Sequence, residues 1–131
     1  MRWRPYAGGV ERATILYDGD CGFCRWALAR ILAWDRRRAL RPVALQDPEA
    51  HALLATVRPE ARGASWHLVL PEGAVRSGGA AVPDLARLLP GGAPIAALAG
   101  RFPRATDRAY RWVAAHRGRL GRLVGERACS R

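Results

Sequence analysis

The 131-residue sequence predicts an α/β fold, with a central mixed sheet flanked by helices. Two observations predict it. The apolar run at residues 13–17 leads into a helical pattern and then into a second strand-like segment, which is a β-α-β opening. Later, a turn at residues 71–73 joins two more strand-like segments. Because a β-α-β unit makes parallel neighbours and a hairpin makes antiparallel ones, the sheet should contain both.

The N-terminal elements follow from simple patterns. Residues 1–12 contain proline and glycine without periodicity, which predicts a flexible N-terminal arm. Residues 13–18 form the first predicted strand. Helical spacing then connects Cys24, Ala27, Leu28, Ile31 and Leu32, which predicts a helix from Gly22 to near Asp35.

The rest of the chain is predicted to form further strands and helices. We expect strands at 40–45, 65–70 and 74–77, and helices at 47–58, 80–89, 94–98 and 104–123. Pro42 favours an edge position for its strand. The last helix carries an apolar stripe of Ala105, Ala109, Trp112, Val113, His116, Leu120 and Leu123, which should face the domain.

This β-α-β-α-β-β-α order is thioredoxin-like. It predicts a thioredoxin-like domain at residues 13–100. Residues 101–131 should form a basic C-terminal helical extension packed on the same domain.

Composition narrows the class of protein. Half the residues are hydrophobic, and no apolar run approaches the ~20 residues of a membrane-spanning helix. No signal-peptide pattern is present, so we expect a cytoplasmic protein. The net charge of +11 is concentrated in residues 25–41 and 101–131. This Arg-rich surface is compatible with weak contact to an anionic surface, but without a nucleic-acid motif we favour a solvated helix face and expect no specific nucleic acid.

The segment Asp18–Cys24 (DGDCGFC) carries the chemistry. Cys21 and Cys24 form a C-x-x-C motif between a predicted strand and helix, where unpaired N–H groups favour a thiolate. A redox pair is the interpretation we favour. A zinc site and a structural disulfide remain as alternatives, although few further metal ligands occur and three cysteines are too few for a disulfide scaffold.

Roles can be assigned within the motif. Cys21 would be the nucleophile, and Cys24, on the apolar stripe, would be the less exposed resolving thiol. Asp18 is either a proton carrier or a turn former, and Asp20 should cap the helix. Arg25 should favour the thiolate and Asp18 and Asp20 should oppose it, and the sequence leaves the balance between them open.

Three further residues bear on the predicted chemistry. The spacer of Gly22 and Phe23 would tune the potential, and Phe23 would either contact a partner or pack. Cys129 would be a free tail thiol or a second-site thiol. We expect no metal, and no cofactor beyond the cysteine pair.

The sequence YDGDCGFC closely resembles the signature of the DCC family of thiol-disulfide oxidoreductases, in which Asp18, Cys21 and Cys24 match the three named residues. The resemblance continues through the Trp34-Asp35-Arg36 segment to a tail with Asp107, Tyr110, Arg117 and Cys129. It implies a thioredoxin-like fold and a protein-disulfide reductase type of activity. Thioredoxins place a cis-proline before the third core strand, facing the cysteines. This sequence has no proline there, and Ser65 is the nearest candidate for that position.

The sequence therefore predicts an enzyme, a thiol-disulfide oxidoreductase with a redox-active Cys21–Cys24 disulfide. Its partners would be a disulfide-containing protein or a small thiol, with an unidentified electron donor. The alternative is a non-catalytic thioredoxin-like binding module, in which the C-x-x-C motif is a redox switch and the basic surface binds a partner.

Overall fold

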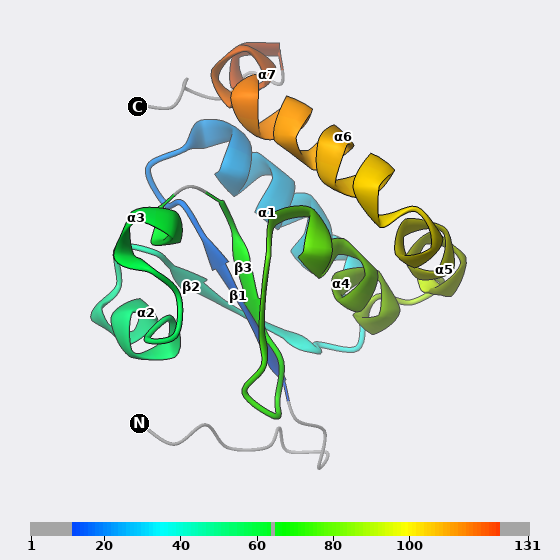
Figure 1. Cartoon of the computed structure of the whole chain (residues 1–131), viewed down its shortest axis with the longest axis horizontal. Helices are drawn as coiled ribbons and strands as arrows, with labels where there is room; N and C mark the ends of the chain where they lie inside the picture. Colours follow the sequence, from blue (N-terminus) through cyan, green and yellow to red (C-terminus); the bar gives the residue numbers. More distant parts are fainter. Residues whose placement is uncertain (1–11, 64, 124–131) are drawn as a thin grey trace.

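The computed structural model describes residues 12–63 and 65–123, and it centres on one four-stranded sheet (Figure 1). The strands are β1 (Ala13–Tyr17), β2 (Leu40–Ala44), β3 (His67–Val69) and β4 (Val75–Ser77), in the order β2-β1-β3-β4. β1 runs parallel to β2 and antiparallel to β3, and β4 is antiparallel to β3. The mixed sheet and the thioredoxin-like fold class are confirmed, as is the edge position of the strand containing Pro42.

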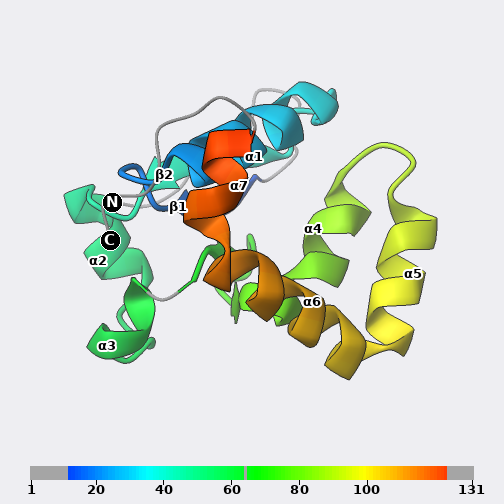
Figure 2. The same ribbon diagram turned by 90° about the horizontal axis from the view of Figure 1, so that it is seen from above.

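Helices cover both faces of the sheet. They are α1 (Gly22–Trp34), α2 (Pro48–Leu53), α3 (Pro59–Arg62), a 3-10 turn η1 (Gly78–Ala81), α4 (Val82–Leu88), α5 (Ala93–Arg101), α6 (Pro103–Ala115) and α7 (Arg117–Leu123). α2 and α3 lie on one face, and α1 and α4 lie on the other (Figure 1). The view from above shows α6 beyond this second face and α7 crossing over α1 (Figure 2).

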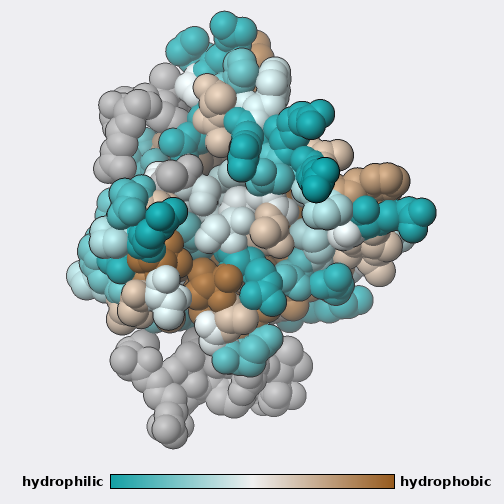
Figure 3. Space-filling model, viewed as in Figure 1, coloured by the Kyte–Doolittle hydropathy of each residue, from teal (hydrophilic) through white to brown (hydrophobic). Residues whose placement is uncertain are grey.

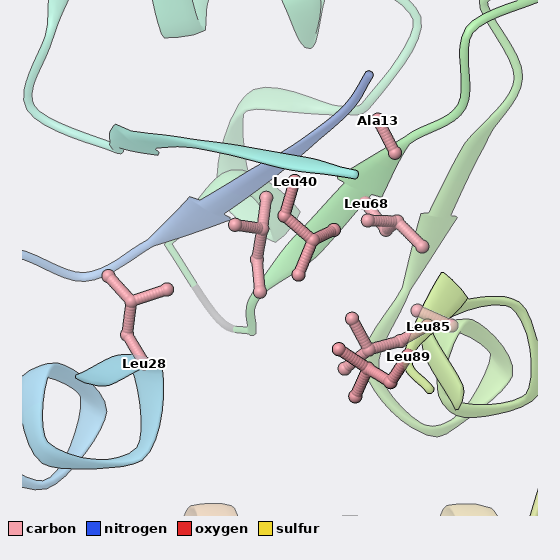
Figure 4. Packing of buried hydrophobic residues seen from close by; sticks show 8 residues of the cluster. Ala13, Leu28, Leu40, Leu68, Leu85 and Leu89 are labelled. Carbon is pink, nitrogen blue, oxygen red and sulfur yellow. The ribbon is translucent and has the colours of Figure 1, made fainter. Parts of the chain in front are cut away.

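The core has one apolar cluster on each face of the sheet. The larger cluster joins the sheet to α1 and α4, and the smaller joins it to α2. In the larger cluster, Leu28 of α1 and Leu85 and Leu89 of α4 point toward Leu40 and Leu68 of the sheet (Figure 4). Alternating side chains of β1 reach opposite faces, since Ile15 joins the larger cluster and Leu16 the smaller. β1 is therefore fixed from both sides, and so is the chain that leaves it.

The turn from α1 to β2 depends on one buried carboxylate. Asp35 follows the last residue of α1, and its two oxygens accept hydrogen bonds from the backbone N–H groups of Ala39 and Leu40, each at 2.9 Å. Arg38 within this turn has a φ of 52°, a conformation that few non-glycine residues adopt. The carboxylate thereby fixes where β2 begins.

Two expectations for the helices are wrong. The helix predicted over 47–58 ends at Leu53, and a separate helix, α3, follows Arg58. The helix predicted over 104–123 is interrupted at His116, whose backbone N–H bonds to the carbonyls of both Trp112 and Val113. The predicted stripe faces the domain only in part, because Val113 lines a cavity against it whereas Trp112 is 57% exposed and Leu123 is 75% exposed.

A close approach of the backbone positions α6. A Cβ atom at Gly79 of η1 would lie 2.5 Å from the Cα atom of Asp107, so only glycine allows this contact. Farther along α6, the Tyr110 hydroxyl accepts a hydrogen bond of 3.2 Å from the backbone N–H of Trp66. α6 therefore contacts the chain at two places, just before β3 through Trp66 and just after β4 through Gly79.

Some expectations fall outside the described part of the chain. These are residues 1–11 of the predicted N-terminal arm and residues 124–131 of the extension, with Cys129. Within the described residues, no helix combines the length and the apolar character needed to cross a membrane.

Candidate functional site

The C-x-x-C segment lies where β1 passes into α1, as predicted. Tyr17 is the last residue of β1, and α1 begins at Gly22 with Cys21 as its N-cap. The Cys21 Sγ atom accepts a hydrogen bond of 3.4 Å from the backbone N–H of Cys24. The prediction that Asp20 caps the helix is therefore wrong, because the sulfur of Cys21 fills that position.

Asp18 and Gln46 hold the loop that precedes the cysteines. The Asp18 side chain is buried, and its Oδ1 atom accepts hydrogen bonds of 3.0 Å from the Asp20 N–H and from the Gln46 side-chain amide. The Gln46 oxygen in turn accepts a 3.0 Å bond from the Gly19 N–H, and its amide also reaches Asp20 at 3.3 Å. The turn-forming role of Asp18 is thus observed, and its role as a proton carrier stays a prediction.

The two cysteines of the motif are in different states. Cys21 is fully buried and disulfide-bonded, whereas Cys24 is a half-buried free thiol. They are therefore not joined to each other in this structure. The expectation that Cys24 is the less exposed of the two is wrong, because solvent reaches Cys24 and not Cys21. The third cysteine, Cys129, lies outside the described residues.

Burial and charge act in opposite directions on Cys24. Burial raises the pKa of its thiol above the ordinary value of 9.0. The Arg117 guanidinium opposes this, since its Nη1 atom donates a hydrogen bond of 3.8 Å to the Cys24 sulfur and its charge lowers the pKa. The Asp18 carboxylate raises the pKa again, and Arg25 lowers it by the smallest amount. Arg25 is exposed and donates a 2.8 Å bond to the Gly19 carbonyl.

A cavity of about 310 Å³ opens beside Cys24. It lies between the sheet and helices α1, α4 and α6, and its walls are mostly apolar, including Ile15, Leu28, Ile31, Val82, Leu85 and Val113. Its polar lining residues are Asp18, Cys24, Ser65, Tyr17, Tyr110 and Arg117. A free thiol therefore lines a cavity that is otherwise largely apolar.

Ser65, the predicted counterpart of the cis-proline position, lines this cavity together with Cys24. Its hydroxyl lies 3.2 Å from the Trp66 carbonyl and also interacts with Tyr110. No peptide bond among the described residues is cis. Burial raises the pKa of Tyr110 above its ordinary value of 10.0, so its phenol is neutral at physiological pH.

The spacer residue Phe23 lies at the same site. Its ring stacks on that of Trp26, with centroids 5.8 Å apart, and Phe23 also lines the cavity. Gly22, the other spacer residue, is buried in the first turn of α1.

Three residues that contribute to the site were not predicted from the sequence: Gln46, Tyr110 and Arg117. Arg117 lies 93 positions from Cys24 in the chain, so no local pattern connects the two. The one available signal was that Tyr110 and Arg117 belong to the tail segment that resembles the DCC family.

Metal ligation finds little support in this part of the protein. Across residues 12–63 and 65–123, no group of three His, Cys, Asp or Glu side chains is placed to hold a metal ion.

Comparison with known proteins gives one match. A family model described as DCC1-like thiol-disulfide oxidoreductase matches residues 15–123, which include the end of β1, both motif cysteines and Arg117. No curated protein and no solved structure matches the chain.

Proposed function

The chain belongs to the DCC1-like thiol-disulfide oxidoreductase family, and on that premise we propose that Cys21 and Cys24 are the redox pair of a protein-disulfide reductase type of enzyme. The Cys21 thiolate attacks a substrate disulfide, forms a mixed disulfide and releases the first substrate thiolate. The Cys24 thiolate then attacks the Cys21 sulfur and releases the second. The Cys21–Cys24 disulfide that remains is reduced by an external dithiol donor.

One observation carries the proposal. Cys21 is bonded to a sulfur other than that of Cys24, while Cys24, one helical turn farther on, is free. Cys24 is thus the thiol that is available to attack the Cys21 sulfur, which is the resolving step of the proposed cycle. The Cys24 backbone N–H, 3.4 Å from the Cys21 sulfur, supports the closeness that this attack requires.

Turnover by cysteine variants tests the proposal. In a disulfide-reduction assay with dithiothreitol as donor, Cys21→Ser and Cys24→Ser should each lose turnover. Ala29→Ser, at an exposed position of α1, is the matched control and should keep it. Full activity of either cysteine variant would refute the redox pair. Loss of turnover in Cys129→Ser would show that the cycle needs a third thiol.

Substrate and compartment are also part of this proposal. We infer that a disulfide-containing protein or a small thiol is the partner of the pair and that the protein works in the cytoplasm. No cofactor other than the cysteines is required for the exchange itself.

The exposed surface of α5 and α6 favours a second candidate function, binding to an anionic lipid surface. Leu98 and Phe102 are 62% and 52% exposed, and arginines are dense on the helices that follow. Figure 3 shows hydrophilic side chains over α6 and α7 and a hydrophobic area toward α5. Apolar side chains beside cations are typical of proteins that bind anionic membranes.

Flotation with lipid vesicles tests this second function. The protein should float with phosphatidylglycerol vesicles at low salt, less so at high salt, and not with phosphatidylcholine vesicles. Phe102→Ser should weaken the binding, whereas Ala115→Ser should not. Equal behaviour with both lipids would argue against it.

A further inference from the structure

The cavity beside Cys24 has the properties of a site for a small ligand. Its volume of about 310 Å³ is at the lower end of the range for small-molecule sites, which is ~300–1,000 Å³. Such sites typically combine apolar walls with a few placed polar groups. Here β1, α1, α4 and α6 supply the walls, and the thiol of Cys24 is among the polar groups.

The polar groups of the cavity are linked to one another. Arg117 donates to the Cys24 sulfur, and its charge also acts on Tyr110. Tyr110 interacts with Ser65. A ligand with an apolar body and a reactive sulfur at one end would therefore fit this cavity. Its sulfur would lie beside the Cys24 thiol and the Arg117 cation, and its apolar body would contact the aliphatic side chains of the walls.

Resting on the proposed function, we propose that this cavity binds the apolar group of a small-molecule disulfide. While Cys21 is disulfide-bonded, as in this structure, Cys24 exchanges with that molecule in a reaction separate from the attack by Cys21. Cys24 is the sulfur concerned because it lines the cavity and is a free thiol, whereas Cys21 is buried and already bonded. The substrate class is an apolar low-molecular-weight disulfide rather than a charged one.

The exchange is a single displacement. The Cys24 thiolate attacks the sulfur that bears the apolar group R, and a bond forms between the Cys24 sulfur and that sulfur. The S–S bond of the small molecule breaks, and its electron pair leaves on the second sulfur as a thiolate. The positive charge of Arg117 beside the reacting sulfur favours the thiolate that attacks.

A series of alkyl 2-pyridyl disulfides tests this proposal. Methyl, butyl and octyl derivatives release the same chromophore, pyridine-2-thione, when a thiol attacks them. Each rate constant is divided by that for glutathione with the same reagent, to remove intrinsic reactivity. The background rate of Cys24→Ser is subtracted, and peptide mapping identifies the modified cysteine.

The expected result is a rate that rises with chain length. Each methylene that enters an apolar site contributes about fourfold, so the corrected octyl rate should exceed the methyl rate by at least about tenfold. A flat or falling series in the wild-type protein would overturn the proposal.

Substitutions that fill the cavity test whether the chain-length dependence arises there. Ala114→Leu on α6 and Ala27→Leu on α1 place a larger side chain in the cavity, and each should lower the octyl rate about tenfold while leaving the methyl rate within about twofold. The neighbouring exposed positions provide matched controls, Ala115→Leu and Ala29→Leu, which should keep the chain-length dependence. Two filling variants on different helices ensure a result if one fails to fold. Unchanged selectivity in both would overturn the proposal.

The proposed function and this inference can fail separately. Absence of catalytic turnover with a persisting chain-length dependence would leave the cavity as a ligand site in a non-catalytic protein. Turnover on disulfides without any chain-length dependence would retain the enzyme and refute the apolar site.

Discussion

Replacing Arg117 by methionine should make Cys24 less reactive at neutral pH. The substitution keeps a long side chain and removes the only guanidinium that donates a hydrogen bond to the Cys24 sulfur among the described residues. Because that cation lowers the pKa of Cys24 against the effect of burial, its loss should raise the pKa further. At any pH below that pKa, less of the thiol is then ionised.

The 3.8 Å separation sets the size of the effect. Opposite unit charges about 4 Å apart attract by about 1 kcal/mol in bulk water and by about 4 kcal/mol at the effective dielectric of a protein surface. Because Cys24 is half-buried, the lower figure is a minimum. About 1 kcal/mol corresponds to a roughly fivefold smaller thiolate population at fixed pH.

The assay is the pH dependence of alkylation of Cys24 by iodoacetamide, with peptide mapping to exclude other thiols. The Arg117→Met profile should move to higher pH, with at least about fivefold slower alkylation at neutral pH. At high pH, where both proteins are fully ionised, the rates should converge. Arg119→Met, at an exposed position of the same helix, should leave the profile unchanged.

A substitution of opposite sign strengthens the test. The Asp18 carboxylate raises the pKa of Cys24, so Asp18→Asn should move the profile to lower pH. If Arg117→Met slowed alkylation equally at all pH values, Arg117 would control access rather than charge. An unchanged profile, or one moved to lower pH, would show that the Arg117 cation does not stabilise the Cys24 thiolate.

Three further predictions concern the scaffold. Asp35→Ala should lower the free energy of unfolding by ~2–5 kcal/mol in urea denaturation, because two buried N–H groups lose their acceptor, and Asp35→Asn should cost less; equal losses would contradict this. Burial holds the pKa of His67 below its ordinary 6.5, so stability should be full above about pH 6.5 and fall as the pH drops toward the folded-state pKa. His67→Asn should flatten that slope, and an unaltered slope would exclude His67 as its source. Gly79→Ala should lower the thermal midpoint, because the new Cβ would lie 2.5 Å from the Asp107 Cα, whereas Gly100→Ala, with nothing within 4 Å, should not.

The sheet and the first helix were predictable because their signals are local. β1 is a short apolar run, and α1 repeats its apolar residues at helical spacing, so each pattern specifies its own element. The C-terminal helices were predicted less well. Their inward face depends on what they pack against, and Trp112, the largest side chain of the expected stripe, is more than half exposed.

The site was predictable only in its local part. The positions of Cys21 and Cys24 follow from the motif, but their relative exposure does not, because exposure depends on whatever covers each sulfur. Asp20 seemed a good helix cap by residue type, yet the Cys21 sulfur takes that place. Gln46 follows the end of β2 and lies 28 positions from Asp18, so no local sequence pattern connects the two residues.

The interruption of the last helix at His116 connects these failures to function. A single helix over 104–123 would continue along the α6 axis, whereas the break allows α7 to turn onto α1 (Figure 2). Arg117 is the first residue after the break and the donor to the Cys24 sulfur. The break at His116 was not predicted from the sequence, and it is this break that brings the Arg117 cation to the Cys24 thiol. Any substitution that straightens this junction should act on Cys24 through Arg117, although it lies more than 90 residues away in the chain.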